Sequence, residues 1–190
     1  MSNYIFIVSA PSGAGKSSLL KAFLNSDIGK DNFAVATSHT TRDPRVGEEH
    51  GREYYFTSIN DFENLLKEDS FVEYANVFKN YYGTSKAEID RLLAAGKNII
   101  LEIDWQGAQQ TRVIYKQKSK SIFILPPSLE ELRNRLETRN TDSKEVIDHR
   151  MEEAESEISH AKDYDCEFIN DDFDQTLEEL MKYFSSITKR

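Results

Sequence analysis

The sequence of 190 residues is short of cysteine and proline, with one Cys and four Pro. A single thiol, Cys166, excludes a disulfide framework within the chain, and no second thiol or histidine cluster offers a structural zinc site. No apolar run approaches the length that spans a membrane, and the first residues lack the basic segment and apolar core of a secretion signal. These absences predict a cytoplasmic protein with no membrane partner.

Positive charge is also scarce, because 24 Lys and Arg face 33 Asp and Glu, for a net charge of −9. This balance disfavours a protein that binds nucleic acid. The excess is uneven: residues 141–190 hold 15 acidic and 6 basic residues, whereas residues 1–140 hold 18 of each. We therefore expect anions to bind within the first 140 residues and the acidic end to form outer helices.

What is present is a globular composition, with 38% hydrophobic and 11% aromatic residues, and a chain in which apolar strands alternate with helices. This alternation predicts an α/β fold with a parallel sheet that helices cover on both faces. Residues 33–83, rich in Tyr, Phe and Thr, are instead typical of a small mixed β insertion with one helix. The predicted core strands are 4–8, 98–104, 121–125 and 166–169, and the predicted helices begin near residues 16, 84, 129, 143 and 173.

A glycine loop joins the first strand to the first helix. Its sequence matches the P-loop pattern, with alanine in place of the first glycine. Such a loop turns backbone N–H groups inward around an anion, and the following helix adds its positive end. Lys16 would contact the β- and γ-phosphates of a nucleoside triphosphate, and the Ser17 hydroxyl would bind Mg²⁺. The residues predicted to bind this nucleotide are Ala10, Pro11, Ser12, Gly13, Ala14, Gly15, Lys16 and Ser17.

Two acids, Glu102 and Asp104, stand at the end of the predicted strand 98–104. Side chains two residues apart share one face of a strand, and ligands of parallel sheets collect at the carboxyl ends of the strands. We expect Asp104 to hold Mg²⁺ through water.

The insertion carries a candidate site for a second phosphate. Arg42 and Arg45 stand three residues apart around a turn, and guanidinium groups bind phosphate through paired N–H donors. Tyrosine hydroxyls further along the insertion, including those of Tyr54 and Tyr82, could complete the phosphate shell.

From Tyr4 to about Phe184, the motifs together resemble the guanylate kinase family, and most closely its bacterial members. The motifs that carry the resemblance are 10–17, 38–45, 80–84, 101–110, 123–128 and 169–174. The resemblance implies a P-loop NTPase core, a GMP-binding insertion and a helical lid. It also implies transfer of the γ-phosphoryl group of ATP to GMP, and to dGMP, with Mg²⁺, in the recycling of guanine nucleotides.

The resemblance also divides one domain, 1–190, into functional parts. The core would comprise 1–32, 84–125 and 158–190, the GMP-binding insertion 33–83, and the lid 126–157. The implied GMP ligands are Ser38, Arg42, Arg45, Tyr54, Glu73, Tyr82, Thr84, Glu102 and Asp104, although family members often carry Asp where this chain has Glu102. The implied catalytic residues are Lys16, Arg42, Arg135, Arg139 and Arg150, with Asn170 near the adenine of ATP.

The chemistry of guanine agrees with these residues. A carboxylate such as Glu73 can accept hydrogen bonds from both N1–H and the N2 amino group, whereas adenine has a bare acceptor at N1. A hydroxyl from Ser38 or Thr84 can donate to O6. A site of this kind discriminates strongly, because the wrong base leaves a buried carboxylate without a partner.

Two other classes of function remain open from the sequence. The chain could be a kinase-like module that binds peptides without catalysis, although the intact Gly15-Lys16-Ser17 argues against this. It could also be a P-loop kinase for another phosphorylated acceptor. A GTPase switch would need a base-recognition motif of the Asn-Lys-x-Asp kind, which the sequence lacks.

Overall fold

A five-stranded sheet forms the centre of the computed structural model, which describes residues 3–77, 79–138 and 143–188. All pairings in this sheet are parallel, and its strand order is β2-β7-β1-β8-β9. Its strands are β1 (Ile5–Ser9), β2 (Phe33–Val35), β7 (Asn98–Glu102), β8 (Ser119–Leu125) and β9 (Cys166–Ile169).

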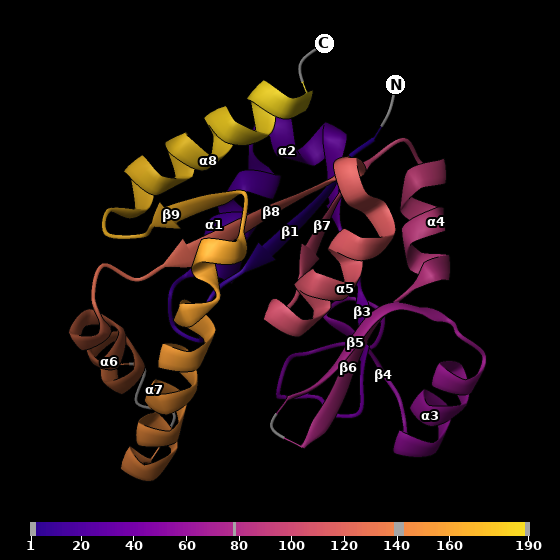
Figure 1. The fold of residues 1–190 in the computed structure, drawn as a ribbon, viewed down its shortest axis with the longest axis horizontal. Helices are drawn as coiled ribbons and strands as arrows, with labels where there is room; N and C mark the ends of the chain where they lie inside the picture. Colours follow the sequence, from indigo (N-terminus) through magenta and orange to yellow (C-terminus); the bar gives the residue numbers. More distant parts are fainter. Residues whose placement is uncertain (1–2, 78, 139–142, 189–190) are drawn as a thin grey trace.

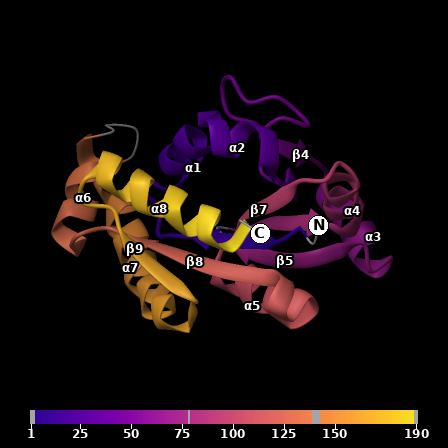
Figure 2. The ribbon, with the colours of Figure 1, turned by 90° about the horizontal axis from the view of Figure 1, so that it is seen from above.

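Helices cover both faces of this sheet, as Figures 1 and 2 show. Every residue of β1 is buried, so alternate side chains enter two separate cores. Ile5 and Ile7 face α4 and α5, whereas Phe6 and Val8 face α1 and α8. The covering helices are α1 (Lys16–Asn25), α2 (Asp27–Asn32), α4 (Lys86–Ala94), α5 (Trp105–Tyr115) and α8 (Phe173–Thr188).

A second, four-stranded sheet lies below the first in the view of Figure 1. Its order is β4-β3-β6-β5, with β3 and β4 parallel and the other pairs antiparallel. Phe62 of the accompanying helix is fully buried and stacks on Phe71 at 4.5 Å and on Tyr81 at 5.2 Å. The elements are β3 (Ser38–Thr40), β4 (Tyr54–Phe56), β5 (Phe71–Val77), β6 (Asn80–Ser85) and α3 (Ile59–Lys67).

Helices α6 (Leu129–Thr138) and α7 (Lys144–Ser159) form a third unit, which lies at the lower left of Figure 1, on the opposite side from the insertion. Leu132, Leu136, Ile147 and Met151 pack together as its own small core. The Ser128 hydroxyl accepts a hydrogen bond from the Glu131 amide at 3.0 Å and so caps the N-terminus of α6. Short 3₁₀ turns follow α5 at Lys116–Lys118 and α7 at Ala161–Asp163.

Several predicted boundaries differ from the structure, and the strand predicted over 121–125 already begins at Ser119. The prediction of an insertion from residue 33 is wrong at its start, because Phe33–Val35 pairs in parallel with β7 and belongs to the core sheet. The helix predicted from residue 84 begins at Lys86, since β6 extends to Ser85. The strand predicted over 98–104 ends at Glu102, because Asp104 caps α5.

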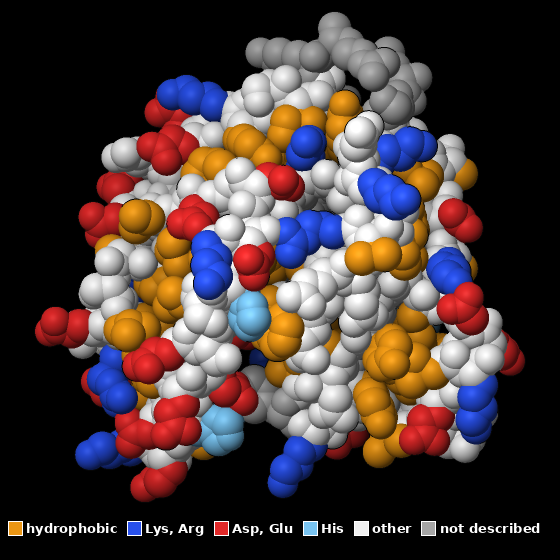
Figure 3. All heavy atoms as spheres, viewed as in Figure 1, with side chains coloured by type: hydrophobic (Ala, Val, Ile, Leu, Met, Phe, Trp, Pro, Cys, Tyr) orange, Lys and Arg blue, Asp and Glu red, His pale blue; other side chains and the backbone are white. Residues whose placement is uncertain are grey.

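The acidic end of the chain lies on the outside, as its composition predicts. Glu145, Glu152 and Glu155 are exposed on α7, and acidic side chains are numerous on this side of the molecule in Figure 3. Among the helices of the described residues, none combines the length and the hydropathy needed to cross a membrane.

Candidate active site

The predicted phosphate loop connects β1 to α1. Gly13 and Gly15 have φ values of 100° and 92°, a region that favours glycine. Gly15 stands directly before the first helical residue, Lys16, so the loop presents backbone N–H groups next to the positive end of α1. A Cβ atom at Gly13 would lie 2.9 Å from a Leu132 methyl group, so α6 packs directly against this loop.

The first of the two acids at the end of β7 contacts the phosphate loop. Glu102 Oε2 accepts hydrogen bonds from Lys16 Nζ at 2.8 Å and from Ser17 Oγ at 3.0 Å. Burial disfavours the Glu102 carboxylate, but the attraction of Lys16 and these hydrogen bonds outweigh it and lower the pKa of Glu102. The carboxylate is therefore ionised beside the loop.

Asp104, the second acid, has a different environment. Its two oxygens accept hydrogen bonds from the Gly107 amide at 2.9 Å and from Gln106 Nε2 at 3.0 Å. The Asp104 side chain thus caps the N-terminus of α5, and these hydrogen bonds fix its position.

A cavity of about 530 Å³ lies between the phosphate loop, the insertion sheet and α7. It brings together most of the residues that the sequence predicts for the two substrates. The predicted residues that line it are Ala10, Ser12, Lys16, Ser38, Arg42, Arg45, Tyr54, Glu73, Tyr82, Glu102, Asp104 and Arg150. A neighbouring cavity of about 510 Å³ shares several of these residues and adds Ser17.

Glu73, on β5, is the most deeply buried acid of the cavity, with 3% of its surface exposed. Its Oε1 atom has no hydrogen-bond partner among the described residues. Burial raises the pKa of this carboxyl to about 7, and the charge of Asp104 adds to the rise, while Thr84 acts against it. A buried acceptor of this kind is costly unless a ligand supplies a donor.

Two hydroxyls lie next to this carboxyl. Thr84 is the register partner of Glu73 across β5 and β6, and its Oγ1 is 3.0 Å from Ser38 Oγ. Ser38 lines the cavity, whereas Thr84 is fully buried and does not, so the wall offers a carboxyl acceptor beside one of the two hydroxyls that the sequence predicts for a guanine edge.

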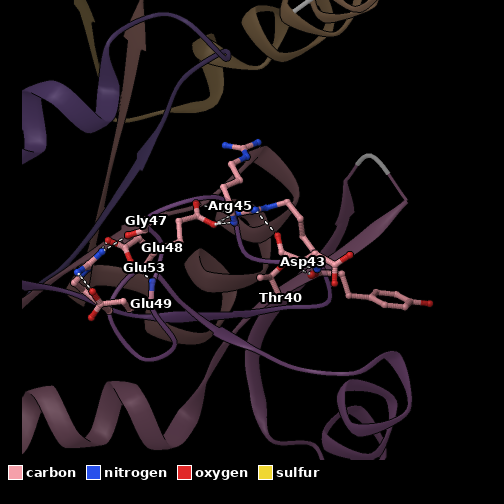
Figure 4. A network of polar contacts seen from close by, with 10 residues as sticks. Thr40, Asp43, Arg45, Gly47, Glu48, Glu49 and Glu53 are labelled. Carbon is pink, nitrogen blue, oxygen red and sulfur yellow. Dashed lines mark hydrogen bonds and ion pairs between the residues drawn. The ribbon is translucent and has the colours of Figure 1, made fainter. Parts of the chain in front are cut away.

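The two arginines of the insertion lie on the loop between β3 and β4. The Arg42 guanidinium is tied to Glu48 at 2.9 Å and lies 5.5 Å from the centre of the Tyr54 ring. The Arg45 side chain extends away from the loop in Figure 4. Both arginines line both cavities, together with Tyr54 and Tyr82.

The predicted lid residues reach the phosphate loop from its other side. Arg150 Nη1 is 3.3 Å from Ser12 Oγ. Arg135 donates to Glu131 at 2.9 Å and to the Asn170 carbonyl at 3.0 Å, so it lies near the loop but outside the lining of the larger cavity. The predicted catalytic residue Arg139 lies outside the described residues.

The Asn170 side chain is hydrogen-bonded to the backbone of the phosphate loop. It is 4% exposed, and its Nδ2 atom donates to the Ala14 carbonyl at 2.7 Å. The same amide group contacts the position where Gly15 would carry a Cβ atom. The side chain is therefore used on the loop backbone.

Sequence reasoning missed Glu157, which lines the larger cavity from α7. Burial raises its pKa to about 7, with the charges of Asp104 and Glu153 adding to the rise. Val146, Arg150 and Glu157 are spaced by four and seven residues, which places them on one face of a helix. This spacing was the signal in the sequence that could have identified Glu157 as a residue of the cavity. Other lining residues that were not predicted are Ala75, Val77, Asn80 and Ile103.

The structure has a phosphate loop on a parallel sheet, a carboxylate beside that loop, and two arginines, Arg42 and Arg45, across the same cavity. We call these two arginines the clamp. This arrangement defines the class of P-loop phosphotransferases. The family model described as "Guanylate kinase" matches residues 2–187. A guanylate kinase from Francisella tularensis (strain FSC 198) is 76% identical over 184 residues, covering 97% of each chain. One from Haemophilus influenzae is 54% identical over 183 residues, covering 96% of this chain and 87% of that protein.

Solved structures agree. The crystal structure of guanylate kinase from Anaplasma phagocytophilum aligns with a TM-score of 0.78 at 31% identity, covering 100% of this chain and 88% of that one. A shikimate kinase from Bacteroides thetaiotaomicron shares the fold alone, with a TM-score of 0.53 at 14% identity over 98% of this chain and 99% of that chain. The chain belongs to the guanylate kinase family.

Proposed function

We propose that the protein transfers the γ-phosphoryl group of ATP to the phosphate of GMP, and of dGMP, giving ADP and the guanosine diphosphate. The observation that carries this proposal is the cavity that Glu73, Arg42, Arg45 and Lys16 line together, in which Glu73 Oε1 has no hydrogen-bond partner among the described residues. Membership of the guanylate kinase family supports the same activity.

The acceptor would bind with its base at the buried wall. In this arrangement, Glu73 as a carboxylate accepts from N1–H and the N2 amino group, and Ser38 or Thr84 donates to O6. Burial raises the pKa of Glu73 to about 7, and the donors of guanine would favour its charged form, so binding of GMP would shift this carboxyl toward ionisation.

The phosphate of GMP would then lie toward the ATP site. Arg42 and Arg45 supply guanidinium donors, and the hydroxyls of Tyr54 and Tyr82 complete the shell. An oxygen of this phosphate attacks the γ-phosphorus as the bond to the bridging oxygen of ADP breaks. Such a transfer asks the protein mainly for position and for neutralisation of charge.

The donor phosphates would bind at the loop of residues 10–17. Lys16 would leave Glu102 to contact the β- and γ-phosphates, and the lid arginines Arg135, Arg139 and Arg150 would approach the transferring group. The buried contact of Asn170 with Ala14 supports a role in holding this loop rather than a contact with adenine.

The residues beside the loop fit Mg²⁺, which prefers hard oxygen ligands. The Ser17 hydroxyl and the Glu102 carboxylate lie 3.0 Å apart, while the oxygens of Asp104 already accept two hydrogen bonds. We therefore propose Ser17 and Glu102 as the side chains nearest the metal, with Asp104 acting through water. Bound Mg²⁺ would neutralise phosphate charge during the transfer.

The test is an ADP-release assay on the purified protein with ATP and, in separate reactions, GMP, dGMP, AMP, CMP or UMP. We expect turnover with GMP and dGMP that far exceeds turnover with the other three. Equal rates with all acceptors would refute the guanine site, and the absence of GMP-dependent turnover would favour a peptide-binding module.

A further inference from the structure

The loop between β3 and β4 contains two separate ionic networks, which Figure 4 shows in part. In the inner one, Arg42 pairs with Glu48, and the two side chains are only 16% and 17% exposed. In the outer one, Arg52 pairs with Glu49 and Glu53, with 53% of Arg52 and 70% of Glu49 exposed. The inner network faces the region assigned above to the acceptor phosphate.

Glu48 connects both arginine positions of the clamp. Its two carboxylate oxygens each accept from Arg42 Nη2 at 2.9 Å, and Oε2 also accepts from the Arg45 amide at 2.8 Å. The Glu48 amide in turn donates to the Arg45 carbonyl at 3.0 Å. One side chain thus fixes a guanidinium and a peptide group three residues apart.

The Arg42 guanidinium is held from other directions as well. Its Nη1 donates to the Asp43 carbonyl at 2.7 Å, and its plane lies near the Tyr54 and Phe56 rings, at 5.5 and 5.8 Å. A guanidinium has five N–H donors, so these contacts still leave donors for a ligand, with the Tyr82 hydroxyl close by.

Arg45 provides the open charge of the clamp. Its guanidinium makes no hydrogen bond or ion pair with the part of the chain that the structure describes, and it extends from the loop in Figure 4. Burial disfavours the Glu48 carboxylate, but hydrogen bonds from the Arg45 amide and from Arg42 outweigh it and lower the pKa of Glu48. The glutamate therefore stays charged at neutral pH.

We propose that Glu48 is a positioning residue for the acceptor phosphate: by fixing the Arg42 guanidinium and the Arg45 peptide, it makes the two arginines converge on one phosphate group. This inference rests on the proposed function. The alternative is that Glu48 only occupies the place of the phosphate until the ligand displaces it. The hydrogen bond that Glu48 accepts from the Arg45 amide argues against this alternative. A phosphate that displaced Glu48 would contact the arginine side chains, and the turn at Arg45 would lose its support.

The test separates the phosphate of the acceptor from its base. Affinities for GMP and for guanosine are measured by calorimetry on the full chain for the wild type, Glu48→Gln and Glu48→Ala. We expect the loss of GMP affinity to reach about 10- to 100-fold for Glu48→Ala, the range of charge-assisted hydrogen bonds. Glu48→Gln keeps an acceptor for the Arg45 amide, so its loss should be smaller, and guanosine affinity should stay within about twofold.

Glu49→Gln is the matched control, because it makes the same chemical change in the exposed network of the same loop. It should leave GMP affinity unchanged, and the Glu48 variants should raise KM for GMP while KM for ATP is preserved. Three results would overturn the inference: unchanged GMP affinity in Glu48→Ala, an equal loss for guanosine and GMP, or tighter GMP binding in Glu48→Gln. A wild type that binds GMP without phosphorylating it would instead contradict the proposed function.

Discussion

The core sheet and the insertion sheet differ in how they create a phosphate site. In the core, β1 is buried along its whole length, and the loop after it presents backbone N–H groups from a short stretch of chain. In the insertion, β3 and β4 are short and half-buried, and the proposed phosphate ligands are side chains from the loop between them, from β4 and from β6. Backbone recognition is therefore local in sequence, while recognition of the acceptor depends on long-range pairing.

In both regions, a basic side chain beside the cavity is paired with a glutamate. Lys16 of the core loop is 2.8 Å from Glu102, and Arg42 of the insertion is 2.9 Å from Glu48. Each cation is thus held by a glutamate, which limits the cost of gathering like charges around one cavity. In the proposed function, the pairing with Glu102 opens when Lys16 contacts phosphate, whereas the pairing of Glu48 with Arg42 is retained.

The largest effect should come from the core loop. Lys16→Ala is expected to lower kcat by about 10³-fold, because a positioned cation is lost at the transferring phosphoryl group. Circular dichroism should show an intact fold, and an ADP-release assay measures the rate. A loss of less than about tenfold would mean that Lys16 does not contact the transferring group.

A change at the buried wall of the insertion should separate the two substrates. Glu73→Gln replaces one of two acceptor oxygens with a donor that opposes guanine, so kcat/KM for GMP should fall by about 100-fold. Binding of ATP to the core loop should be unchanged. Steady-state kinetics with each substrate varied in turn would measure both, and wild-type GMP kinetics in the variant would contradict the base contact.

Matched substitutions in the hydrophobic interiors of the insertion and of the central sheet can test whether these two regions act independently. Phe62→Ala in the insertion and Phe23→Ala in the core each remove a fully buried ring, and each should lower the free energy of unfolding by about 3–5 kcal/mol. Chemical denaturation measures this loss. We expect only Phe62→Ala to raise KM for GMP while KM for ATP is retained. Equal increases in KM for GMP and for ATP in Phe62→Ala would show that the packing of the insertion also affects the ATP site.

The smallest effect concerns the pH dependence of stability at the cavity. The pKa of Glu157 is raised from 4.5 to about 7 by burial, so the folded state of the wild type loses stability as pH rises from about 4.5 to about 7. Glu157→Gln cannot ionise at this position. Its thermal midpoint relative to the wild type should therefore increase over this range and level off above it.

Thermal unfolding between pH 4.5 and 8 measures that difference. Glu152→Gln, on the exposed side of the same helix, is the control and should show little change with pH. A constant difference for Glu157→Gln at all pH values would mean that Glu157 is not the group that titrates.

The elements that sequence reasoning placed well are those with local signals. The strand at 4–8, the glycine loop and the strand at Cys166–Ile169 each depend on residues that are near one another in the chain. β2 was missed as a core strand because Phe33–Val35 is only three residues long, and its pairing with β7 lies more than sixty residues away in sequence.

The site shows the same division. The sequence by itself determined the phosphate loop, since glycine conformation and the start of α1 are set within a few residues, and it determined which side chains carry charge. Only the tertiary structure decided how those charges pair. It paired Glu102 with Lys16, it placed the Asn170 side chain on the loop backbone, and it brought Glu157 into the cavity. These contacts join segments that are distant in sequence, so burial and packing select them.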